Sequence, residues 1–149
     1  MEVHSEGLVH KGSCFNFLYL MTVTLVSSVS AGFPSPASDY MEEKIDLNEK
    51  LIRHPSATFL FRVEGESMIG AFIPDNALLV VDRSERAQND SIVVAVVDGE
   101  FTVKRLVLEF ARRYLAPENP KYKSIYITED MQCNIWGVVT YIITDAKEV

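Results

Sequence analysis

An Asp-Gly pair at positions 98 and 99 lies between two apolar runs, and it constrains the fold more than any other short stretch. Asp and Gly both tolerate positive φ, so the pair favours a two-residue turn that joins two antiparallel strands. The strands predicted on its two sides are 91–97 and 101–108. Similar short β-rich runs separated by turn-forming residues occupy 58–63, 77–81, 125–128 and 136–143. We therefore predict a mainly β domain.

Composition and charge narrow the class of protein. A chain of 149 residues with 48% hydrophobic residues suits one globular domain with a buried core. The net charge of −7 argues against electrostatic binding of nucleic acid over a broad surface, because such binding needs clustered Lys and Arg. Cys14 and Cys133 form no CxxC pair, so neither a zinc site nor a disulfide framework is indicated. We expect no other metal and no cofactor. A reducing cytoplasm fits this pattern best.

One short helix and one linker are expected before the strands. Apolar residues recur within 42–52, Asp46 or Asp39 can cap the helix and Pro55 can stop it, so we predict a helix over Asp46–Arg53. Two prolines, a glycine and serines fill 32–39, which indicates an extended linker. An exposed, extended segment is also a shape that a protease accepts as substrate.

The segment 13–31 carries no charge, and two interpretations of it stay open. Val29 and Ala31 would suit a signal-peptidase site, so residues 1–31 can be a secretory signal peptide. Against this, acidic Glu2 and Glu6 precede the apolar run, and the alternating stretch 22–25 is typical of a strand. A transmembrane helix is the least favoured reading because the run is short and contains Asn, Ser and Thr.

Ser67 is the first candidate for chemistry. The apolar run 58–63 breaks at Gly65, and a small hydroxyl just past a glycine can sit exposed at a tight turn, as a nucleophile requires. Serines beside glycines also commonly make turns without any chemistry. From this stretch alone both interpretations remain.

Lys104 is the second candidate. Strand alternation places Thr102, Lys104 and Leu106 on one face and Arg105 on the other, so one of the two basic residues must project from a face that competes to be buried. Burial lowers the pKa of a lysine and leaves a neutral amine that can take a proton from a serine. The alternative is an edge-strand lysine that discourages aggregation. The histidines at 4, 10 and 54 offer little support for a Ser-His-Asp triad.

Several motifs in this order resemble one family. They are Ala31-Gly32, Phe-Pro-Ser-Pro-Ala at 33–37, His-Pro-Ser-Ala-Thr at 54–58, Gly-Glu-Ser-Met at 65–68 and Asp-Gly-Glu-Phe-Thr-Val-Lys-Arg-Leu at 98–106. Together they resemble the UmuD-type SOS mutagenesis proteins, which are shorter relatives of the self-cleaving domain of the LexA repressor. The resemblance covers about Ala31 to Tyr141, and residues 1–30 match only loosely.

The resemblance implies both a fold and an activity. The fold would be a LexA/signal-peptidase-like twisted β-sheet domain over 46–149, with one short helix, an extended linker at 32–45 and a removable N-terminal arm at 1–31. The activity would be autocatalytic cleavage by a serine protease, a hydrolase in which Ser67 is the nucleophile and Lys104 the general base. The peptide bond between Ala31 and Gly32 would be its substrate, with backbone N–H groups around Ser67 as oxyanion donors.

The resemblance also implies partners and a place in the cell. A RecA filament on single-stranded DNA would stimulate cleavage after DNA damage, as part of the SOS response and DNA repair. The product would act as a homodimer with a UmuC-type Y-family DNA polymerase in error-prone translesion synthesis. The protein would be cytoplasmic, with no membrane segment and no strong nucleic-acid binding of its own.

Two departures keep alternatives open. The family usually has a Gly-rich, acidic turn and a Gly-Asp pair after the serine, whereas this chain has Asp75-Asn76 there, and its apolar arm is long. One alternative is a secreted β-rich domain in which residues 1–31 are a signal peptide. Another is a binding module that kept the fold and lost cleavage. A LexA-like repressor is disfavoured because 31 residues without helical periodicity are too few for a helix-turn-helix.

Overall fold

The computed structural model describes residues 22–25, 31–32 and 43–147. The chain divides into two compact units, with the boundary in the sequence between Asp46 and Leu47. In the first unit, strand β1 (Thr22–Leu25) pairs antiparallel with strand β2 (Glu43–Asp46). The alternating stretch 22–25 therefore forms the strand that its pattern predicted. Cys14, the other residues of 13–21, residues 26–30 and most of the proline linker lie outside the described residues.

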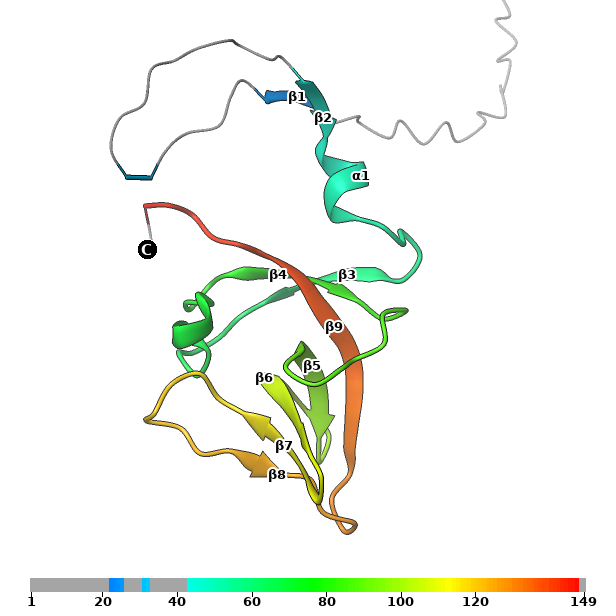
Figure 1. Cartoon of the computed structure of the whole chain (residues 1–149), viewed down its shortest axis with the longest axis vertical. Coiled ribbons are helices and arrows are strands. Elements are labelled where there is room, and N and C mark those ends of the chain that lie inside the picture. The colour runs from blue at the N-terminus through cyan, green and yellow to red at the C-terminus, as the bar shows by residue number, and fades with distance from the viewer. Residues whose placement is uncertain (1–21, 26–30, 33–42, 148–149) are drawn as a thin grey trace, which may run out of the picture. The chain divides into compact units, whose positions relative to one another are not determined.

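The second unit is a short helix followed by one seven-stranded sheet. Helix α1 spans Leu47–Leu51, within the predicted range but shorter than it. The strands are β3 (Thr58–Arg62), β4 (Leu78–Asp82), β5 (Ile92–Val97), β6 (Glu100–Glu109), β7 (Arg112–Ala116), β8 (Ile125–Tyr126) and β9 (Cys133–Ile143). Their order in the sheet is β3-β4-β9-β5-β6-β7-β8, and every neighbouring pair is antiparallel. The sheet curls along its length (Figure 1). The predicted mainly β fold with one short helix is confirmed.

The hairpin between β5 and β6 forms where the sequence predicts it. Val97 pairs with Glu100, and the two residues between them have positive φ, 49° at Asp98 and 90° at Gly99. This backbone twist matches the twist of the two strands, as in a two-residue primed turn. Strand β2 was not among the predicted strands, because 43–45 was expected to be linker and Asp46 to begin the helix. Strand β7, which begins with two arginines, was not predicted either. It forms because all five of its residues pair with β6.

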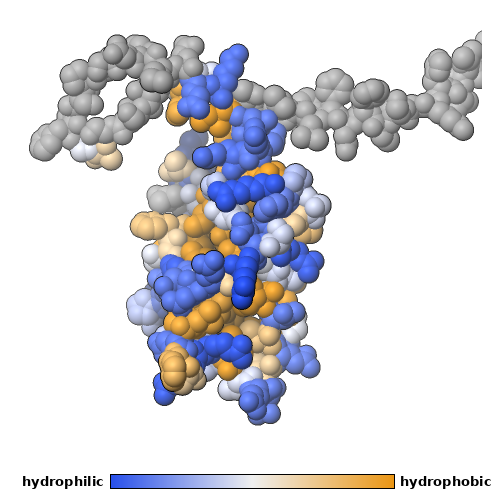
Figure 2. All heavy atoms as spheres, turned by 45° about the vertical axis from the view of Figure 1, so that its right-hand side comes forward, coloured by the Kyte–Doolittle hydropathy of each residue, from blue (hydrophilic) through white to orange (hydrophobic). Residues whose placement is uncertain are grey.

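Two apolar clusters stabilise the sheet. One contains Val63, Met68, Ile73, Ala77, Leu79, Val81 and Val94, and the other contains Val93, Ala95, Leu106 and Leu115. The first cluster includes residues from the β3–β4 connection, so that connection is packed into the core at several points. Apolar residues also reach the surface between polar ones on the face drawn in Figure 2. Counting all faces, Phe59, Leu60 and Phe101 belong to the exposed large hydrophobic residues.

Within the described ranges, no helix has the length and apolar character needed to cross a bilayer.

Candidate active site

The connection between β3 and β4 carries Ser67. Two backbone hydrogen bonds close the base of this connection, from Val63 N to Ala77 O (2.9 Å) and from Asn76 N to Val63 O (3.0 Å). Gly65 has a φ of 90°, a conformation that glycine adopts without steric cost. Its N–H donates to the Asp75 carboxylate over 2.7 Å. The chain therefore turns sharply just before Ser67 and is held across the loop at that turn.

Met68 fixes the orientation of its neighbour. Its side chain is 1% exposed and belongs to the first apolar cluster, whereas Ser67 is only partly buried. A 3₁₀ helix (Ile69–Ala71) follows at once. Because Met68 occupies the core, the preceding hydroxyl lies at the boundary between core and solvent. Ser67 thus lies at a turn, as the sequence suggested, but it is partly buried and not fully exposed.

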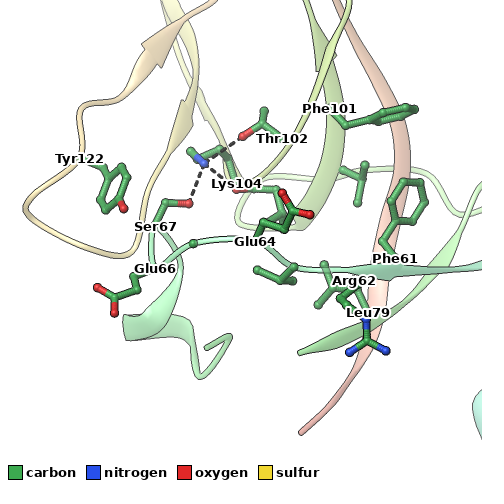
Figure 3. A pocket seen from close by; sticks show the side chains of 14 residues that line it. Phe61, Arg62, Glu64, Glu66, Ser67, Leu79, Phe101, Thr102, Lys104 and Tyr122 are labelled. Atoms are coloured by element: carbon green, nitrogen blue, oxygen red, sulfur yellow. Dashed lines mark hydrogen bonds between the residues drawn. The ribbon is translucent and has the colours of Figure 1, made fainter. Parts of the chain in front are cut away.

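Lys104 approaches Ser67 from strand β6. Its side chain is 7% exposed, and its Nζ lies 2.8 Å from Ser67 Oγ. The same nitrogen donates to Thr102 Oγ1 (2.9 Å) and to the Val103 carbonyl (2.8 Å). Figure 3 shows the amine directed at the two hydroxyls. Lys104 is therefore the buried basic residue of β6 that strand alternation required.

Burial lowers the pKa of the Lys104 amine. A neutral amine has two N–H donors and one lone pair. The Val103 carbonyl can only accept, and Thr102 Oγ1 can accept the second N–H, which leaves the lone pair facing the Ser67 hydroxyl. A protonated amine would instead donate to all three oxygens. The site can therefore hold either protonation state without an unpaired N–H.

Ser67 and Lys104 line a cleft of about 420 Å³. Phe61 and Phe101 stand on one side of it, with ring centroids 5.4 Å apart. Tyr122, from the connection between β7 and β8, stands on the opposite side (Figure 3). A cleft with aromatic walls and a few convergent polar groups has the general make-up of a binding or active site.

The structure thus brings Ser67 and Lys104 together. Ala31 and Gly32 belong to the first unit, and both are exposed. His54 contacts Asp82 instead, with Nδ1 and Oδ2 2.6 Å apart, and neither lines the cleft. Burial raises the pKa of Asp82, but hydrogen bonds from Ser84 and His54 outweigh this effect and hold the pKa at about 2. His54 therefore contacts Asp82, the last residue of β4, and takes no part in the cleft.

The altered turn after Ser67 is compatible with the fold. Phe72 and Asn76 adopt positive φ, 60° and 64°. Asn tolerates this geometry, as the sequence suggested, whereas Phe does so only under strain. Asp75 contributes the carboxylate that accepts from Gly65 N. The departure from the family pattern therefore supplies a contact to the serine loop.

Sequence reasoning missed several residues that shape the site. Thr102 was placed on the same strand face as Lys104 but received no role, although a hydroxyl two residues from a buried lysine is a usable signal. Asp75, Glu118 and Asn119 contact the serine loop through its backbone. Backbone contacts of this kind leave no pattern in the sequence, so no local signal points to these three residues.

With this geometry established, comparison with known proteins gives the class. Residues 24–140 match the Peptidase S24-like family. The chain is 48% identical to the protein ImpA of Escherichia coli over 121 residues, which is 80% of this chain and 81% of ImpA. It is 50% identical to the protein SamA of Salmonella typhimurium over 113 residues, or 76% of this chain and 78% of SamA. It is also 36% identical over 118 residues to the LexA repressor of Clostridium perfringens, covering 79% of this chain and 57% of the repressor.

The chain therefore belongs to the Peptidase S24-like family of LexA-like, self-cleaving serine peptidases. Its similarity to ImpA and SamA places it among the UmuD-type proteins of SOS mutagenesis. The family that the sequence motifs resembled is confirmed.

Proposed function

We propose that Ser67 and Lys104 are the catalytic pair and that the chain cuts its own peptide bond between Ala31 and Gly32. The observation that carries this proposal is the 2.8 Å separation of Ser67 Oγ and a buried lysine amine in a cleft of about 420 Å³. A general base must lie within hydrogen-bond reach of the proton that it abstracts. Small residues at the bond let the backbone enter a narrow cleft.

The steps of cleavage follow from the hydrogen-bond contacts of the Lys104 amine. Neutral Lys104 takes the proton of Ser67 Oγ as this oxygen attacks the carbonyl carbon of Ala31. The resulting ammonium donates to Thr102 Oγ1 (2.9 Å) and the Val103 carbonyl (2.8 Å), the two oxygens near it other than Ser67 Oγ. Lys104 then protonates the leaving amine of Gly32, and residues 1–31 remain as an ester on Ser67. Water hydrolyses this ester with Lys104 again as base.

The tetrahedral intermediates need donors for their oxyanion. We assign this task to backbone N–H groups at Ser67, because a donor must be fixed before charge develops. Val63 and Met68 hold the loop in the core on both sides of the serine. Because arm and catalyst belong to the same chain, or to two chains of a dimer, attack is effectively unimolecular.

The proposal divides the chain into a removable arm at 1–31, an extended linker at 32–45 and a Ser/Lys peptidase domain at 46–149. The product would begin at Gly32. By analogy with UmuD-type proteins, a RecA filament on single-stranded DNA would stimulate cleavage in the cytoplasm. The product would then act as a homodimer with a UmuC-type Y-family DNA polymerase. The net charge of −7 supports a role in which RecA and the polymerase, and not this chain, bind the DNA phosphates.

The decisive experiment compares the purified full-length protein with Ser67→Ala and with Ser56→Ala, an exposed serine outside the cleft. After alkaline incubation, mass spectrometry and N-terminal sequencing should find a product starting at Gly32 in the wild type and in Ser56→Ala. Ser67→Ala should remain intact. Loss of residues 1–31 from purified Ser67→Ala would refute self-cleavage and favour removal by a separate signal peptidase.

A further inference from the structure

The connection between β7 and β8 holds the serine loop through its backbone. The N–H of Glu118 donates to the Ser67 carbonyl (2.9 Å), and the Glu118 carbonyl accepts from Gly70 N (2.8 Å). These two bonds flank Met68 and the start of the 3₁₀ helix. Glu118 therefore fixes the chain at Ser67 and again three residues later, at Gly70.

Asn119 adds a third contact on the other side of Ser67. Its side chain is 7% exposed, and its Nδ2 donates to the Glu66 carbonyl (2.8 Å). Its Oδ1 accepts from Lys121 N (3.0 Å). Both ends of this buried amide are therefore paired, and the stretch Glu64–Glu66, which is itself exposed, gains a fixed point beside the serine.

The fit between the two segments is tight. A Cβ added to Gly70 would lie 2.4 Å from the Glu118 carbonyl oxygen, closer than any real Cβ contact. No side chain can therefore separate the serine loop from the β7–β8 connection at this point. The contact between Gly70 and the Glu118 carbonyl therefore sets the distance between the serine loop and the β7–β8 connection.

Glu118 also joins the serine loop to the strand that carries Lys104. Its carboxylate forms an ion pair with Arg105 Nε, and Arg105 donates in addition to the Asp90 carbonyl (2.7 Å). Arg105 follows Lys104 directly in β6, so the two side chains leave the strand on opposite faces. A single residue thus contacts Ser67 through its backbone and the neighbour of Lys104 through its side chain.

We propose that Glu118 and Asn119 are positioning residues that hold Ser67 Oγ within reach of Lys104 Nζ. This inference rests on the proposed function of that pair. The reason is geometric, because a displacement of about 1 Å at a reacting atom can cost on the order of 100-fold in rate. The three backbone contacts of Glu118 and Asn119 lie at Glu66, Ser67 and Gly70, around the nucleophile itself.

The test uses the full-length protein with Asn119→Leu, which has similar volume but no amide, and Glu118→Gln, which keeps every backbone contact but loses the ion pair. Glu100→Gln, at the exposed β5–β6 turn, is the matched control. Self-cleavage is followed from pH 5 to 11, and labelling of Ser67 by a small phosphonofluoridate is measured in parallel. Thermal unfolding shows which variants are folded at the assay temperature.

Asn119→Leu should lower the alkaline plateau of cleavage roughly 10- to 100-fold, and Glu118→Gln a few-fold, with the pH midpoint of the profile unchanged. Labelling should fall in the same proportion, because positioning acts on the pair itself and not on delivery of the arm. Glu100→Gln should match the wild type. If Asn119→Leu is unfolded, Glu118→Gln decides alone.

Wild-type plateaus in both folded variants would overturn the proposal, as would a fall in cleavage with normal labelling, which would assign the segment to arm binding. In either case a wild type that cleaves and a Ser67→Ala variant that stays intact would leave the proposed function standing. Loss of the arm from Ser67→Ala would instead refute the function on which the positioning role rests.

Discussion

The pH dependence of self-cleavage depends on the surroundings of Lys104. A lysine with the ordinary pKa of 10.5 is neutral in roughly one molecule in 3,000 at pH 7. Burial lowers the pKa of Lys104, and each lowering of the pKa by one raises that neutral fraction tenfold until the amine is mostly neutral. The cleavage rate should therefore rise about tenfold per pH unit below the pKa of Lys104 and level off below pH 10.5.

The Thr102 hydroxyl provides a way to move this profile. It is one of three acceptors around the Lys104 amine, and an ammonium needs all three, whereas a neutral amine needs two. Thr102→Val removes this acceptor with little change of shape, so the midpoint should move to lower pH. The plateau should fall on the order of tenfold, because the lone pair is no longer fixed toward Ser67. Thr102→Ser keeps a hydroxyl and should resemble the wild type.

The assay is the first-order rate of loss of intact chain at each pH from 5 to 11, read by mass spectrometry at a temperature where every variant is folded. A rate that is flat over the whole range would count against a lysine base. A rise that continues to pH 10.5 would show an ordinary lysine and refute the argument from burial. A midpoint that Thr102→Val moves to higher pH would refute the assignment of its hydroxyl as an acceptor.

Three further predictions concern single side chains. Lys104→Met should reduce cleavage at least about 100-fold. The folded-state pKa of Lys104 lies below 10.5, so the wild type should gain stability as pH rises through that pKa toward 10.5. Lys104→Met should not show this gain. Thermal melts of both proteins across pH would check this, and parallel curves of melting temperature against pH would contradict it. Gly99→Ala should lower the free energy of unfolding by about 1–2 kcal/mol, because φ is 90° at this position, although the added Cβ would meet no atom within 4 Å. Urea unfolding measures this change, and an unchanged midpoint would argue against this turn geometry. Asp82→Asn should cost about 1.5–3 kcal/mol at neutral pH through weaker bonds to Ser84 and His54. With a folded pKa of about 2 against 3.8, wild-type stability should fall as pH drops between these values, and a variant with the same fall would disprove the role of this carboxylate.

The strand pattern and one turn were local enough to predict from the sequence. Asp98-Gly99 specified its hairpin because both residues accept the positive φ that the turn requires. The period of two along β6 placed Lys104 on the same face as Leu106, which is buried. Helix α1 was predicted too long, and β7 was missed because its stability comes from pairing with β6 and not from its own composition.

The sequence by itself therefore determined most of the strands, the hairpin and the two residue types that the chemistry needs. Only the tertiary structure decided that they meet. Ser67 follows β3, whereas Lys104 lies on β6, four places further along the sheet order β3-β4-β9-β5-β6. The curl of the sheet brings them to 2.8 Å, and the burial that lowers the pKa of Lys104 exists only in the folded protein. The contacts of Glu118 and Asn119 arise in the same way, since backbone partners are chosen by packing between distant segments.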